Sequence, residues 1–224
     1  MNTMLRPADM NATAPKQIVF VIDDDVDVRE GLRSLLDSVR LDCEVFTSTR
    51  EFLNRKSTNA VSCLILDVRL PGPSGLDFQV ELAAAHIDIP IIFITGYGDI
   101  PMSVRAMRAG AVEFLTKPVR GQDLLDAVGV ALERDRVRRE RDKKLQALKE
   151  RYLSLSARER EVMELVTTGM LNKQIAGRMN LSEVTVKVHR HNLMSKLGAK
   201  SVPELVKMGE ALRQAGQGNS TTLL

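Results

Sequence analysis

The sequence predicts an α/β fold: a doubly wound, five-stranded parallel sheet, followed by a linker helix and a small all-helical domain. Short apolar runs alternate with amphipathic segments in residues 17–132, which is typical of a parallel sheet covered by helices on both faces. Charge dominates residues 133–152, and short helical patterns separated by turns occupy residues 153–213. With 224 residues, 44% of them hydrophobic, the chain can bury two small cores.

Five apolar runs mark the predicted strands. They are IVFVI (18–22), CEVF (43–46), SCLIL (62–66), IIFI (91–94) and VEFL (112–115). The segment after the first run predicts a helix, because its apolar side chains share one face of a 3.6-residue period: Val28, Leu32, Leu35, Leu36 and Val39. We expect the polar lead, residues 1–16, to be disordered and the tail, residues 214–224, to be flexible.

The segment from residue 121 predicts a helix that continues into the charged linker. Leu124, Val128 and Ala131 form one apolar stripe, but residues 133–152 offer only four apolar contacts: Val137, Leu145, Leu148 and Tyr152. We therefore expect a long exposed helix, which could pair with its copy in a dimer. A disordered charged linker is the alternative.

Composition excludes several classes of protein. No apolar run approaches the roughly 18 residues that a membrane span needs, and the N-terminal lead lacks the apolar core of a signal peptide. We expect a cytoplasmic protein with no membrane partner. Cys43 and Cys63 lie in strand-like runs and are expected to be reduced core thiols, and three dispersed histidines cannot build a zinc site.

Charge divides the chain into an acidic front and a basic back. Residues 1–132 hold 13 Lys and Arg against 18 Asp and Glu, whereas residues 133–151 hold 9 against 5 and residues 156–213 hold 10 against 6. The basic part could contact nucleic acid, or it could be an ordinary solvated surface.

One edge of the predicted sheet collects charged and hydroxyl groups. Asp23 and Asp24 follow the first strand, Asp67 the third, Thr95 the fourth and Lys117 the fifth. Ligands of open parallel sheets gather at the carboxyl ends of the strands, so these groups form a candidate site. Crowded carboxylates need a metal ion, a basic side chain or water beside them.

Magnesium fits this candidate site better than calcium. Asp23, Asp25 and Asp27 are spaced as in an EF-hand loop, but Val28 stands where that loop needs glycine and Ser34 where it needs glutamate. Mg²⁺ prefers one or two carboxylates with waters and phosphate oxygens, and one carboxylate could then attack phosphorus. We expect Asp25 and Asp27 to be solvated acids that open the first helix.

The motifs IDD (22–24), ILDVRLPGPSG (65–75), FITGYGD (93–99) and FLTKP (114–118) resemble the flavodoxin-like receiver domain of two-component response regulators, in its FixJ-like branch. The resemblance implies that Asp67 accepts a phosphoryl group. It makes Asp23 and Asp24 the acid pair that binds Mg²⁺, with the backbone carbonyl of Arg69 as a further ligand. It also implies that Thr95 and Lys117 contact the phosphoryl group and that Phe114 is an aromatic switch.

The basic C-terminal part predicts a helix-turn-helix. Ser156 and Glu159 form a capping box, Gly169 ends that helix, Asn172 can cap the next helix and Ser182 a third. The third helix carries the cations Lys187, Arg190 and Lys196, as expected of a helix that enters the major groove. A plain helical docking module is the alternative.

Residues 150–213, and TVKVH (185–189) within them, resemble the LuxR-type DNA-binding domain of the NarL-like regulators. The resemblance implies a four-helix unit whose recognition helix begins near Ser182 or Glu183. It places Lys187, Val188 and His191 against bases, and it places phosphate contacts at Asn172, Lys173, Thr185 and Arg190.

Together the two resemblances imply a phosphorylation-dependent transcription regulator rather than an enzyme. Its implied partners are a sensor histidine kinase, double-stranded promoter DNA, RNA polymerase and a second copy of the chain, with Met102, Val104 and Met107 as candidates for the dimer interface. Two alternatives stay open. A phosphatase would need a second acid two residues after Asp67, where Arg69 stands, and a dimerisation scaffold would need no phosphorylation.

Overall fold

The computed structural model describes residues 16–97 and 100–217. The chain divides into two compact units, residues 1–139 and 140–224. Most of the lead (1–16) and of the tail (214–224), expected to be disordered and flexible, lies outside the described residues. None of the helices in the described ranges combines the length and the apolar character that a membrane crossing requires.

The first unit contains the predicted five-stranded parallel sheet, in the order β2-β1-β3-β4-β5. The strands differ from the predicted runs by no more than one residue at either end, so the prediction is confirmed. Their bounds are Gln17–Ile22 (β1), Asp42–Phe46 (β2), Val61–Asp67 (β3), Ile91–Thr95 (β4) and Glu113–Thr116 (β5).

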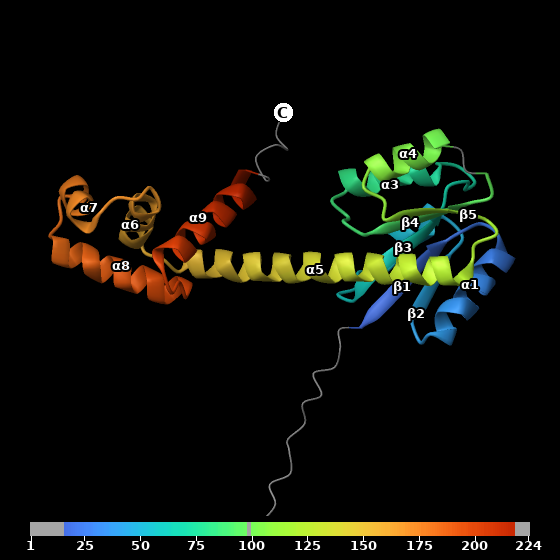
Figure 1. The fold of residues 1–224 in the computed structure, drawn as a ribbon, viewed down its shortest axis with the longest axis horizontal. Coiled ribbons are helices and arrows are strands. Elements are labelled where there is room, and N and C mark those ends of the chain that lie inside the picture. Colours follow the sequence, from blue (N-terminus) through green and yellow to red (C-terminus); the bar gives the residue numbers. More distant parts are fainter. Residues whose placement is uncertain (1–15, 98–99, 218–224) are drawn as a thin grey trace, which may run out of the picture. The chain divides into compact units, whose positions relative to one another are not determined.

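Alternate residues of the central strands fill two separate cores, because successive side chains of a strand point to opposite faces. One face packs against α2, α3 and α4, and the other packs against α1 and the first half of α5 (Figure 1). Four phenylalanines contact one another within the first core: Phe20, Phe46, Phe52 and Phe78. The helices are Val26–Ser38 (α1), Thr49–Leu53 (α2), Gly75–Ala84 (α3), Ile100–Arg108 (α4) and Gly121–Leu153 (α5).

Helix α5 is continuous through the charged linker, as the sequence predicts. Leu124, Val128 and Ala131 are fully or almost fully buried against the sheet. Near the other end of α5, Leu148 and Tyr152 pack against the core of the second unit. Asp135, in the charged stretch between them, is unexpectedly 0% exposed.

The second unit packs four further helices around its own core: Ala157–Thr167 (α6), Asn172–Met179 (α7), Glu183–Leu197 (α8) and Val202–Gln217 (α9). Ser156 and Glu159 form the predicted capping box, and Ser182 caps α8 through the backbone N–H of Thr185. Gly169, with a φ of +88°, follows the end of α6 as expected.

The predicted cap of α7 is wrong by one residue. Leu171 holds the N-cap position with an extended backbone, and its N–H donates to the side chain of Gln174 at 2.8 Å. Asn172 is therefore the first residue of the helix. Its side-chain oxygen accepts a hydrogen bond from Arg190 of α8 instead.

Candidate functional site

Three aspartates gather at the carboxyl end of the sheet, as the strand order requires. Asp23 follows β1, Asp67 ends β3, and carboxylate oxygens of Asp23, Asp24 and Asp67 lie within 4.8 Å of one another. Asp23 is fully buried and Asp67 is 5% exposed, whereas Asp24 is exposed. The predicted cluster is therefore an acidic pocket with one solvent-facing member.

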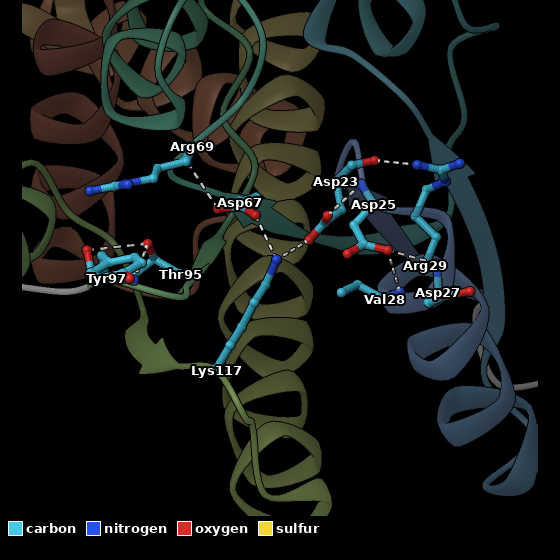
Figure 2. Close-up of polar contacts among 10 residues, drawn as sticks. All are labelled: Asp23, Asp25, Asp27, Val28, Arg29, Asp67, Arg69, Thr95, Tyr97 and Lys117. Atoms are coloured by element: carbon cyan, nitrogen blue, oxygen red, sulfur yellow. Dashed lines mark hydrogen bonds and ion pairs between the residues drawn. The ribbon is translucent and has the colours of Figure 1, made fainter.

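Lys117 extends from the end of β5 into this pocket, between two of the acids (Figure 2). Its ammonium donates to Asp23 Oδ2 and to Asp67 Oδ2, at 2.6 Å in each case. The backbone N–H of Lys117 donates to the Thr95 carbonyl at 2.8 Å, which fixes the start of the loop. Three strand ends, distant in sequence, thus meet at one ammonium group.

The charges of the pocket do not balance. One ammonium faces three carboxylates, and burial raises the pKa of Asp23 despite opposing hydrogen bonds from Lys117 and from the Asp25 N–H. Burial alone would lower the pKa of Lys117, but its hydrogen bonds to Asp23 and Asp67 outweigh that effect, so the pKa is raised. Hard carboxylate oxygens this close together suit Mg²⁺, so the residues fit that ion.

Backbone groups fix the two buried carboxylates. Asp67 Oδ1 accepts from the N–H of Arg69 at 2.9 Å, and Asp23 Oδ1 accepts from the N–H of Asp25 at 3.0 Å. Asp25 itself caps α1 by accepting from the N–H groups of Asp27 and Val28. This confirms that Asp25 and Asp27 are helix-entry acids.

Gly75, the first residue of α3, allows the chain to pass close to the acceptor strand. A Cβ atom at Gly75 would overlap the carbonyl oxygen of Asp67. The Gly75 N–H also donates to the Val68 carbonyl at 2.9 Å. Glycine is the residue that allows such a close approach of two backbone segments, so Gly75 directly after PGPS is the signal for it in the sequence.

Thr95 is the last residue of β4, and Phe114 lies in β5. The Thr95 hydroxyl is fully buried and accepts from the N–H of Tyr97 at 3.3 Å. Phe114 is half-buried, and its ring centroid lies 6.3 Å from that of Phe93.

Arg69 contributes a contact that the sequence did not predict. Its guanidinium lies over the ring of Tyr97, 4.7 Å from the centroid, and Tyr97 is 73% exposed (Figure 2). The resemblance assigned a role only to the backbone carbonyl of Arg69, whereas this cation–π contact involves its side chain.

Helix α4 carries the residues predicted for a dimer interface. Val104 and Met107 are 41% and 44% exposed, whereas Met102 is half-buried and packs against the first core. Ile100, at 80% exposure, adds to the apolar surface of this helix. Two of the three predicted residues are therefore accessible, and the third is shared with the core.

The predicted DNA-contacting residues lie on α7 and α8. Lys173, Lys187, Val188 and His191 are exposed. Arg190 is half-buried and donates from Nη1 to Asn172 Oδ1 at 2.8 Å, which joins the two helices. Thr185 shares a hydrogen bond with the Ser182 hydroxyl at 2.8 Å. The predicted phosphate contacts thus include groups that also hold the motif together.

Two family patterns match the chain, one for each unit. The pattern of the response regulator receiver domain matches residues 19–129. The pattern of the bacterial regulatory proteins of the luxR family matches residues 153–209.

Relatives match across both units. The chain is 54% identical over 197 residues to Nodulation protein W of Bradyrhizobium diazoefficiens, a match that covers 88% of this chain and 87% of that protein. It is 48% identical to the response regulator protein TodT of Pseudomonas putida, with coverages of 88% and 87%. It is 40% identical to the transcriptional regulatory protein FixJ of Azorhizobium caulinodans, with coverages of 85% and 90%.

Solved structures agree with these matches. The response regulator StyR has a TM-score of 0.76 and 48% identity, and the match covers 87% of this chain and 98% of that one. Full-length FixJ from B. japonicum has a TM-score of 0.54 and 35% identity, with coverages of 90% and 99%. A receiver domain implies a histidine kinase partner, and a LuxR-type domain implies DNA binding. The chain belongs to the two-component response regulators, as a transcription regulator rather than an enzyme, with a phospho-acceptor aspartate site and a LuxR-type helix-turn-helix.

Proposed function

We propose that Asp67 is the residue that accepts the phosphoryl group, from a sensor histidine kinase. The observation that carries this proposal is the Lys117 ammonium held between Asp67 and Asp23, at 2.6 Å from each. Asp67 ends the central strand β3, so the groups on β1, β4 and β5 surround it. Its carboxylate oxygen would attack phosphorus while the bond from phosphorus to the donor breaks.

Asp23, Asp24 and Asp67, with the backbone carbonyl of Arg69, are the groups that we propose hold Mg²⁺. A bound Mg²⁺ would offset the negative charge that Lys117 alone leaves in the pocket. Lys117 would then contact the phosphoryl oxygens, and the Thr95 hydroxyl would leave Tyr97 to do the same. The half-buried Phe114 would turn inward as the loop after β4 moves.

Phosphorylation would act by pairing two copies of the chain through α4 and β5. The exposed side chains of Val104 and Met107, with Met102 beside them, support this face as the homodimer interface. Two linked recognition helices would bind half-sites about 34 Å apart, and linking them raises affinity through effective concentration.

Double-stranded promoter DNA is the proposed ligand of the second unit. Lys187, Val188 and His191 would contact bases, and the exposed Lys173 would contact a phosphate. Arg190 has further N–H groups beyond the one that Asn172 accepts, and we assign it, with Asn172 and Thr185, to the phosphate backbone. We also propose that RNA polymerase is a partner and that the protein acts in the cytoplasm.

Substitution of Asp67 tests the assignment. We expect Asp67→Asn to take up no phosphoryl group from acetyl phosphate with Mg²⁺, because the nucleophilic carboxylate is gone, whereas Asp27→Asn should label like the wild type. Intact-mass spectrometry measures the labelling. Sedimentation velocity measures the oligomeric state, and DNA titration measures the affinity for DNA. Undiminished labelling of Asp67→Asn would contradict the assignment. Labelling without any change in oligomeric state or affinity would contradict the dimer alone.

A further inference from the structure

Helix α8 presents a stripe of side chains opposite to the face that it buries. Val186, Leu193 and Leu197 are fully buried in the core of the second unit. At 3.6 residues per turn, positions 184, 187, 188 and 191 lie on the opposite side of the helix, and all four are exposed. This stripe contains the three proposed base-contacting residues and a fourth residue, Val184.

Val184 is the most exposed of the three valines in α8. It is 70% exposed, and Val188, one turn further along, is 52% exposed. Both positions are neighbours on the helix surface. Folding gains little from an apolar side chain at this level of exposure, and valine is a weaker helix former than alanine, lysine or glutamate. The apolar character of Val184 therefore points to a contact outside this chain.

We propose that Val184 is a specificity-determining residue that packs against the 5-methyl group of a thymine in the major groove. The inference rests on the proposed DNA-binding function and deepens it. Val184 is the second residue of α8, and the N-terminal residues of a recognition helix contact base edges. Thymine is the base that presents a methyl group in the major groove.

The chemistry of the stripe favours a base over a phosphate as the partner of Val184. Valine offers neither a hydrogen-bond donor nor a charge, so it cannot bind a phosphate oxygen. Lys187 lies on the same stripe and supplies the cation that attracts the DNA backbone or a guanine edge. Val184 and Val188 are separated by about 6 Å along the helix axis, so they reach different base pairs.

Uracil replacement isolates the methyl group as the proposed contact. Randomised duplex DNA is first selected with the full-length, phosphorylated protein, and each thymine of the selected half-site is then replaced by deoxyuridine, which lacks only the methyl. We expect a loss of about three- to fivefold in affinity of the wild type at a thymine read by Val184, from the apolar area of one methyl. Val184→Ala should remove this methyl effect at that position, and Val188→Ala, the matched control, should leave it unchanged.

Each outcome decides between readings. Loss of the methyl effect at one position in Val184→Ala alone supports the inference. Retention of every methyl effect in Val184→Ala overturns it, as does uniform weakening on all sequences or a selected site with no methyl-sensitive thymine. An unchanged DNA affinity together with altered sedimentation would assign Val184 to a protein contact instead. If the phosphorylated wild type binds no DNA, the proposed function fails, and this inference fails with it.

Discussion

A buried carboxylate lies at each end of strand β3: Asp67 of the strand itself at the carboxyl end, and Asp135 of helix α5 at the amino end. The two carboxylates are paired with cations in different ways. At the carboxyl end of β3, Asp67 shares the single ammonium of Lys117 with Asp23, beside Asp24. At its amino end, the N–H of Ser62 donates to Asp135 of helix α5. At the carboxyl end, three carboxylates face one ammonium. At the amino end, Asp135 pairs with two arginines, Arg138 and Arg139, and the exposed Asp88 lies 3.7 Å from Arg138.

Every oxygen of Asp135 has a strong donor. Oδ2 accepts from the Ser62 N–H at 2.9 Å and from Arg139 Nε at 2.5 Å, and Oδ1 accepts from Arg138 Nη2 at 2.5 Å. Arg139 also donates to the carbonyl of Asn59. This cluster, which we call the Asp135 clamp (Ser62, Asp135, Arg138 and Arg139), ties the charged part of α5 to the sheet.

Asp135 stabilises the fold, whereas Asp67 remains available for chemistry. Buried charge is tolerated when it is fully paired and hydrogen-bonded, which describes the Asp135 clamp. The acidic pocket has two negative charges beyond what Lys117 offsets, so a further cation would stabilise it. The same strand thus provides a structural contact at one end and a reactive site at the other.

The largest expected effect comes from breaking the Asp135 clamp. Asp135→Ala leaves the Ser62 N–H unpaired and two arginines without their shared anion, so we expect a loss of about 2–4 kcal/mol in the free energy of unfolding. Urea denaturation measures it, with hydrogen exchange of residues 61–67 as the local readout. Glu133→Gln, an exposed neighbour on the same helix that pairs with Arg136, should change stability by less than about 0.5 kcal/mol. Equal losses in the free energy of unfolding for Asp135→Ala and Glu133→Gln would contradict a structural role for Asp135.

At the acidic pocket, we expect a substitution to raise the free energy of unfolding instead of lowering it. Asp23→Asn removes one of the repelling charges while Lys117 keeps its contact with Asp67, so we expect a gain of about 1 kcal/mol in Mg²⁺-free buffer. The wild type should gain stability when Mg²⁺ is added, and Asp23→Asn should gain less, because ligands stabilise the state that binds them. Thermal unfolding with and without Mg²⁺ measures both. Asp42→Asn, in an exposed ion pair with Lys16, is the control, and a destabilised Asp23→Asn would contradict the charge argument.

The helical unit also contains a buried carboxylate, Glu159, that is paired with a cation. Glu159 is 4% exposed. Its carboxylate accepts a hydrogen bond from Lys196 at 2.7 Å and another from the Ser156 N–H, and these contacts lower its pKa. Its contribution to stability is therefore present above the ordinary pKa of glutamate, about 4.3, and is lost as the pH falls through the lowered value. We expect Glu159→Gln to cost about 1 kcal/mol at neutral pH.

Acid should remove the difference in stability between Glu159→Gln and the wild type. Hydrogen exchange in α6 and α8 should distinguish the two proteins near neutral pH. The two proteins should converge only when the pH falls below the lowered pKa of Glu159, where the wild-type carboxyl is protonated. Glu161→Gln, at an exposed position of the same helix, should match the wild type throughout. A difference that persists in acid would mean that hydrogen-bond geometry, rather than charge, stabilises this cap.

The smallest expected effect concerns thiol reactivity beside the clamp. Burial raises the pKa of Cys43 to about 11 and that of Cys63, next to Ser62, still further. Native protein should therefore react slowly with a thiol reagent at pH 8. In a Cys43→Ser background, Asp135→Ala should accelerate labelling of Cys63 severalfold by opening the amino end of β3, whereas Asp67→Asn should not. Equal rates would show that the clamp does not protect this end.

Local patterns explain why most elements were predictable. Apolar runs and helical periods fixed the strands and helices, and parallel strand order brought Asp23, Asp67 and Lys117 to one edge of the sheet. The caps at Ser156 and Ser182 depend only on neighbouring residues, so they were predicted correctly. Asn172 was misplaced because Leu171 and Gln174 provide an alternative start for α7 that side-chain preference alone does not reveal.

The sequence by itself determined which groups meet at the carboxyl edge of the sheet, because the topology of a parallel sheet leaves little choice about where strand ends lie. Only the tertiary structure decided that Asp135 is buried, that Arg69 lies over Tyr97 and that Arg190 joins α8 to Asn172. Asp135 and Ser62 are 73 residues apart, and in the sequence Asp135 is one charge among many on a solvated helix. Its role follows from three-dimensional proximity, where desolvation makes one carboxylate a structural contact and leaves its neighbours in solvent.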